Sequence, residues 1–117
     1  MLFRSETRAD NDASSLIGPI LGHIGDGNFH CAYLFDGSKP AEVAEARRLN
    51  ERLVARALAM GGTCTGEHGI GVGKMASLEK EHGDLIPTMR AIKRALDPQN
   101  LMNPGKIFRL EERGPSR

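Results

Sequence analysis

The sequence predicts an α+β fold, an antiparallel hairpin with helices packed on one face, and three observations support this. The pair Asp26-Gly27 separates two apolar runs, which is typical of a tight hairpin turn. Apolar residues with helical spacing follow from about Lys39 to Met60. Further helical patterns cover 74–82 and 84–96, and the 117 residues provide for one domain at most.

The hairpin predicts that two histidines face each other. We expect strands over 16–23 and 29–35, with residues 25 and 28, 24 and 29, and 23 and 30 as cross-strand pairs. Paired residues share a face and have Cβ atoms roughly 4.5–5.5 Å apart. His23 and His30 would therefore converge, whereas Cys31 would point away as a buried thiol.

The other segments are predicted from capping and spacing. Residues 6–15 are polar and predict a frayed segment or loop, and Gly61-Gly62 predicts the end of the first long helix. Residues 63–68 predict a short strand or extended loop. The last helix should end at Asp97-Pro98. Its predicted buried stripe consists of Leu85, Met89, Ile92 and Leu96.

Composition excludes several classes of partner. The net charge is +1 with both signs interspersed, and aromatic residues make up 4%, so we expect no nucleic-acid partner. No apolar run approaches the roughly 20 residues of a transmembrane segment. Two cysteines form no disulfide framework, which favours a cytoplasmic location, with the mitochondrial matrix also compatible.

A second motif, 63–69, adds Glu67 and His68 to the two histidines. His23, His30 and Glu67 form a mixed nitrogen and oxygen donor set with an open position, typical of catalytic Zn²⁺ and compatible with Mn²⁺ or Fe²⁺. A base beside such a metal can remove a hydroxyl proton, and His68 is the candidate. Alternatively, Glu67 and His68 cap a helix or bind backbone. His82 is interpreted as a surface histidine.

Three motifs in order resemble the C-terminal part of the FAD-linked 2-hydroxy-acid dehydrogenases. These motifs are Gly22-His23-Ile24-Gly25-Asp26-Gly27-Asn28-Phe29-His30, the segment 62–71 around Thr65-Gly66-Glu67-His68-Gly69, and the segment 96–106 ending in Asn103-Pro104-Gly105-Lys106. The family includes D-lactate dehydrogenase of the cytochrome type, the glycolate oxidase FAD subunit and D-2-hydroxyglutarate dehydrogenase. The resemblance covers roughly residues 6–109.

The resemblance implies roles for particular residues. His23, His30 and Glu67 would bind the divalent metal, His68 would take the substrate hydroxyl proton, and Asn103 would lie towards the flavin. FAD would be held by a separate FAD-binding domain, and the electron acceptor stays open. The substrate would be a small 2-hydroxy acid. Cys31-Ala32 favours D-lactate, because the hydroxyglutarate enzymes carry asparagine at the position of Ala32.

The chain is expected to divide into three parts, of which the middle one is assigned by the resemblance. We expect a non-native leader over 1–5, the C-terminal half of a ferredoxin-like cap domain over 6–110, and a disordered tail over 111–117. The chain would then be a truncated fragment that is inactive alone. The alternatives are a small autonomous metal-binding module, hydrolytic through a metal-bound water, or an inert fragment.

Overall fold

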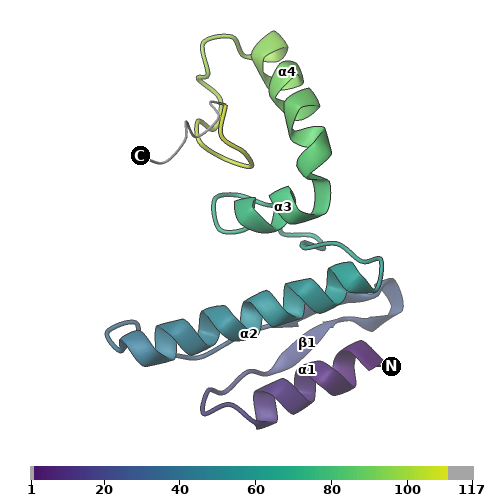
Figure 1. The fold of residues 1–117 in the computed structure, drawn as a ribbon, viewed down its shortest axis with the longest axis vertical. Coiled ribbons are helices and arrows are strands. Elements are labelled where there is room, and N and C mark those ends of the chain that lie inside the picture. Colours follow the sequence, from purple (N-terminus) through teal and green to yellow (C-terminus); the bar gives the residue numbers. More distant parts are fainter. Residues whose placement is uncertain (1, 111–117) are drawn as a thin grey trace. The chain divides into compact units, whose positions relative to one another are not determined.

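A computed structural model describes residues 2–110, and these form two compact units, Met1–Glu67 and His68–Arg117, which we describe separately (Figure 1). The disordered tail predicted for 111–117 lies outside the described residues. The first unit contains α1 (Leu2–Asp12), β1 (Ile20–His23), β2 (Asn28–Cys31) and α2 (Pro40–Ala59). The second contains α3 (Met75–His82) and α4 (Ile86–Leu96), joined by a 3₁₀ turn, Gly83–Leu85.

The hairpin is present, but its register differs from the predicted one. His23 pairs with Asn28 and Leu21 pairs with His30, because a 3₁₀ turn, Ile24–Asp26, replaces the two-residue turn. The predicted pairing of His23 with His30 is therefore wrong by two residues. The offset is even, so both histidines stay on one face of the sheet. An isolated bridge between Ile17 and Leu34 continues the ladder in the same register.

Helices cover the face of the hairpin opposite the histidines. Tyr33 packs against a small core made of Leu16, Ala46 and Leu49, the last two contributed by α2. The side-chain amide of Asn11, in α1, donates to Cys31 Sγ at 3.4 Å. This arrangement confirms the α+β fold and the orientation predicted for Cys31, whose side chain is half-buried.

The prediction of a loop over 6–15 is wrong, because Leu2–Asp12 forms α1. Thr7 and Asp10 of this helix face α2 instead of solvent. Arg56 of α2 donates to Thr7 Oγ1 at 2.8 Å and to Asp10 Oδ2 at 2.6 Å, and Thr7 is fully buried. Tertiary ion pairs therefore stabilise a helix that has no conventional apolar stripe.

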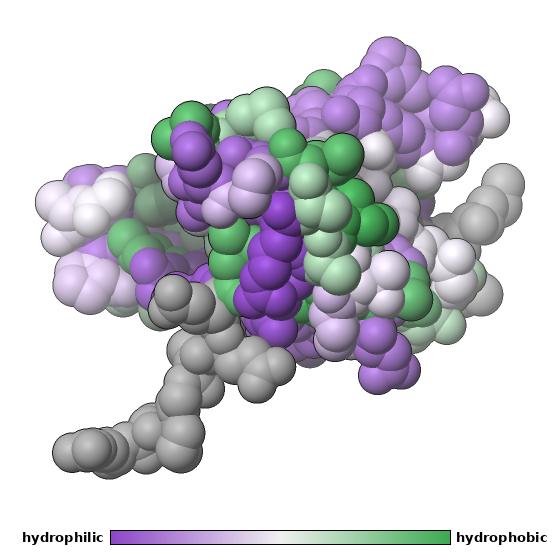
Figure 2. Space-filling view, turned by 90° about the horizontal axis from the view of Figure 1, so that it is seen from above, coloured by the Kyte–Doolittle hydropathy of each residue, from purple (hydrophilic) through white to green (hydrophobic). Residues whose placement is uncertain are grey.

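The second unit exposes a face that the sequence predicted to be buried. Leu85 is 51% exposed, Ile92 56% and Leu96 75%, while Met89 is half-buried. Ile86, one position after Leu85, is the buried residue of α4. The periodicity identified the apolar stripe correctly, but no element formed by residues 68–110 packs over it. Figure 2 shows hydrophobic residues at the surface among hydrophilic ones on the face that it draws.

A loop follows α4 and is fixed by Asp97. Lys93 binds the Asp97 carboxylate, which also accepts the backbone N–H groups of Leu101 and Met102 at 2.9 Å each. Lys93 first, and then these two N–H groups, lower the pKa of Asp97 to about 2. The loop that carries Asn103 is therefore ordered by one carboxylate.

Candidate metal centre

A helix cap directs the chain from α2 to the second motif. The N–H of Gly61 donates to Leu58 O at 3.0 Å and that of Gly62 to Ala57 O at 2.8 Å, while Gly61 has a φ of +76°. This pair of bonds is a Schellman motif, which ends the helix where Gly61-Gly62 predicted. The loop that follows is anchored by the buried side chain of Cys64. No strand forms over 63–68; the segment is a loop with bends at 64 and 66–68, so the prediction of a loop is confirmed and that of an extended conformation is not.

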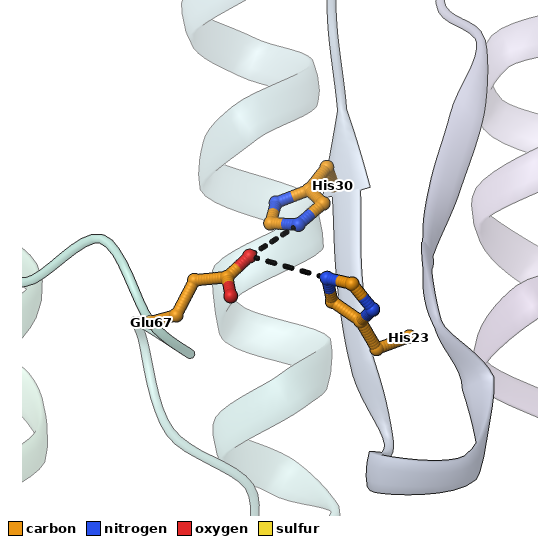
Figure 3. A group of neighbouring side chains, drawn as sticks. All are labelled: His23, His30 and Glu67. Carbon is orange, nitrogen blue, oxygen red and sulfur yellow. Dashed lines mark ion pairs between the residues drawn. The ribbon is translucent and has the colours of Figure 1, made fainter.

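The loop brings Glu67 over the face of the hairpin that carries the histidines (Figure 3). Glu67 Oε1 lies 2.9 Å from His30 Nε2 and 3.7 Å from His23 Nε2. The two imidazole rings are 6.2 Å apart between centroids and nearly perpendicular, at 86°. Three candidate ligands from two separated segments thus point to one place within the first unit.

The chemistry of this donor set fits a divalent cation. One ligand atom from each of His23, His30 and Glu67 lies within 4.8 Å of the others. Tetrahedral Zn²⁺ with ligand bonds of ~2.0–2.1 Å separates ligand atoms by roughly 3.3 Å, between the two distances seen here. Small side-chain rotations would bring all three within bonding reach. The side chains of His23 and Glu67 are 62% and 48% exposed, so a fourth position is accessible to solvent.

Two glycines allow this approach. A Cβ at Gly22, whose φ is +151°, would lie 2.2 Å from the carbonyl oxygen of Asn28. A Cβ at Gly66 would lie 2.0 Å from Asn28 Oδ1. The strands and the loop therefore meet at Asn28, a residue that sequence reasoning did not single out. Asn28 could have been found from the sequence, because side chains alternate between the two faces of a strand and Asn28 therefore shares a face with His30.

The other two predicted site residues belong to the second unit. His68 is its first residue and is exposed. Asn103 is exposed, has a φ of +46°, and accepts the Lys106 N–H at 3.3 Å. Together with Asn100, Lys106 and other residues of the loop, Asn103 lines a cavity of about 180 Å³. Asn100 Oδ1 is buried and has no hydrogen-bond partner among the residues that the structure describes.

Comparison with known proteins identifies one group of relatives. Residues 3–107 match the family described as FAD linked oxidases, C-terminal domain. A protein named "Probable D-lactate dehydrogenase, mitochondrial" from Danio rerio is 54% identical over 108 residues, covering 92% of this chain and 22% of that protein. "D-lactate dehydrogenase [cytochrome], mitochondrial" from Arabidopsis thaliana is 52% identical, covering 89% and 18%. "Glycolate oxidase subunit GlcD" from Escherichia coli K12 is 42% identical, covering 72% and 17%.

Proposed function

Because the chain belongs to the FAD-linked oxidase family, we propose that it supplies the metal centre and the proton-accepting histidine of an enzyme that oxidises a D-2-hydroxy acid to the 2-keto acid. The chain spans about a fifth of the length of the curated relatives it matches. We therefore propose that FAD is bound mainly by a separate domain. D-lactate or glycolate is the proposed substrate, in keeping with the names of the relatives.

The observation that carries this proposal is the convergence of His23, His30 and Glu67. The two imidazoles present Nε2 and the carboxylate balances charge, a set suited to Zn²⁺, with Mn²⁺ or Fe²⁺ as alternatives. A bound cation supplies Lewis-acid chemistry, lowering the pKa of a coordinated hydroxyl group. His68, which follows Glu67 directly in the chain, would accept that proton, and FAD supplies the acceptor for the C2 hydride.

Three finer predictions belong to the same proposal. Asn103 would face the flavin from its loop, supported by the positive φ that holds the turn and by the adjacent cavity. The fold would be the C-terminal half of a ferredoxin-like cap. For location we propose the cytoplasm or, following the names of two relatives, the mitochondrial matrix. Among residues 2–110 no helix has the length and apolar character that crossing a membrane requires.

Zinc titration of the purified 117-residue chain tests the metal site. We expect one Zn²⁺ per chain by isothermal titration calorimetry, with affinity reduced at least about a hundredfold in His30→Ala and Glu67→Gln. His82→Ala is the matched control, because His82 is an exposed histidine of α3 and should leave the affinity unchanged. Equal affinity for His30→Ala and His82→Ala would refute the site.

Activity is tested in a chimaera, because the separate domain is needed for FAD. The 108-residue match allows this chain to replace the corresponding segment of the zebrafish relative. His68→Gln should lower the kcat for D-lactate roughly 10²–10⁴-fold, as expected for removal of a general base, whereas His82→Gln should not. The autonomous hydrolytic module remains the alternative. Zinc-dependent cleavage of a test ester by the chain alone would favour it.

A further inference from the structure

We propose that Asn28 is the positioning residue of the metal centre: Gly66 rests on its side-chain amide, and this contact holds the Glu67 carboxylate over the two imidazoles. This inference rests on the proposed metal function and assigns a role to a residue that binds no metal in that scheme. It concerns residues of the first unit only.

The hairpin places Asn28 beside both histidines. Asn28 is the cross-strand partner of His23. It also precedes His30 by two positions on β2, so the three side chains lie on one face of the sheet. Its half-buried amide is therefore a fixed part of the surface from which the imidazoles project.

The loop rests directly on this amide. A Cβ at Gly66 would lie 2.0 Å from Oδ1, 2.7 Å from Cγ and 3.2 Å from Nδ2, and all three nearest atoms belong to Asn28. The backbone of Gly66 does not adopt a positive φ. Glycine is thus favoured here for space and not for conformation. A side chain at this position would have to displace the Asn28 amide or lift the loop away from the hairpin.

The height of the loop controls the ligand geometry. Cys64, buried two residues before Gly66, fixes one end of the segment, and Glu67 is the next residue after the contact. Consecutive Cα atoms are only about 3.8 Å apart, so a displacement at Gly66 also changes the position of the Glu67 backbone. A shift of about 1 Å would break the 2.9 Å contact between Glu67 and His30.

Zinc affinity of four variants of the 117-residue chain tests the proposal. We expect Asn28→Ala and Gly66→Ala each to weaken Zn²⁺ binding, on the order of 10–100-fold, because residues that orient metal ligands commonly have effects of this size. In the double variant the alanine at 66 occupies space vacated by the amide, so the two losses should not add. Gly37→Ala is the control, since nothing lies within 4 Å of a Cβ there. Additive losses would overturn the direct contact.

A second measurement works without metal. In the metal-free chain we expect a nuclear Overhauser effect between the His30 ring and the Glu67 side chain, which should disappear in Asn28→Ala and persist in the isosteric Asn28→Asp. Persistence of this signal and of zinc affinity in Asn28→Ala would overturn the proposal. If the parent chain binds no Zn²⁺, the metal function is refuted. If the nuclear Overhauser effect is nevertheless lost in Asn28→Ala, the positioning role of Asn28 is supported. Gly66→Ala probes the contact from the loop, should the hairpin of Asn28→Ala fail to fold.

Discussion

Replacing Arg56 with alanine should weaken the packing of α1 against α2. The guanidinium group donates to Thr7 Oγ1 at 2.8 Å and to Asp10 Oδ2 at 2.6 Å, and forms an ion pair with Glu6 at 2.8 Å. The side chains of Arg56 and Asp10 are 12% and 17% exposed, so their pairing is largely shielded from water. A single side chain thus joins three positions of α1.

The magnitude follows from these contacts. A hydrogen bond to a charged group contributes about 1.5–3 kcal/mol, and we take the lower end for Asp10 because Arg52 still neutralises it. The bond to Thr7 adds about 1 kcal/mol, and the exposed pair with Glu6 adds little. The free energy of unfolding should therefore fall by about 2–3 kcal/mol, a large part of the roughly 5–15 kcal/mol of a typical domain.

Urea unfolding followed by circular dichroism measures this change, with Arg47→Ala as control because Arg47 is exposed on the same helix. Hydrogen bonds from Arg52 and then Arg56 lower the pKa of Asp10 below 3.8. A carboxylate whose pKa is lower in the folded chain than in the unfolded chain stabilises the fold when the pH is above its unfolded-state pKa. This stabilisation is lost as the pH falls through its folded-state pKa. The difference between parent and Arg56→Ala should hence be complete at pH 7 and narrow below about pH 4. Equal stability of the two arginine variants at pH 7 would refute the reasoning.

Three further predictions concern other parts of the chain. Gly22→Ala should lower the free energy of unfolding by at least about 2 kcal/mol, since it adds backbone strain and a clash, whereas Gly37→Ala should change it little; equal thermal melts would contradict this. Asp97→Asn keeps one of the two acceptor oxygens, so it should reduce the protection of the Leu101 and Met102 amides against hydrogen exchange at every pH, while in the parent chain this protection holds above pH 4 and decreases towards pH 2. Unchanged protection in Asp97→Asn at pH 7 would contradict the role of this carboxylate. Ile92→Lys should reduce the fluorescence of the dye ANS bound to the chain, because it interrupts an exposed apolar stripe; identical fluorescence would show that the stripe is covered.

Local signals in the sequence predicted the elements whose formation depends on nearby residues. The long helix ends at Gly61-Gly62 as expected, because a Schellman cap needs only its own glycines and carbonyl groups. The shared face of His23 and His30 was also predictable, since it depends on alternation along two strands. The exact register was not, because a 3₁₀ turn competes with the two-residue turn at Asp26-Gly27.

The elements that the sequence predicted wrongly depend on distant contacts. The helix of residues 2–12 is stabilised by Arg56, more than forty positions away, and no local pattern in a polar segment reveals such a partner. The stripe on α4 was identified by its period, but a period shows which residues are apolar and not whether another element covers them. The lack of room for a side chain at Gly66 likewise arises from Asn28, which belongs to a different segment.

The two-residue difference between the predicted and the observed register of the hairpin has a consequence for protein engineering. Insertions or deletions that slide one strand past the other by two residues keep both imidazoles on the same side, whereas a slide by one residue turns one of them to the opposite side. Libraries that vary the connection between the strands should therefore keep His23 and His30 on one face only where the register changes by an even number of residues, and a shared face is a requirement of the proposed metal site. Whether the register changes by an even or an odd number of residues therefore matters more than the length of the connection.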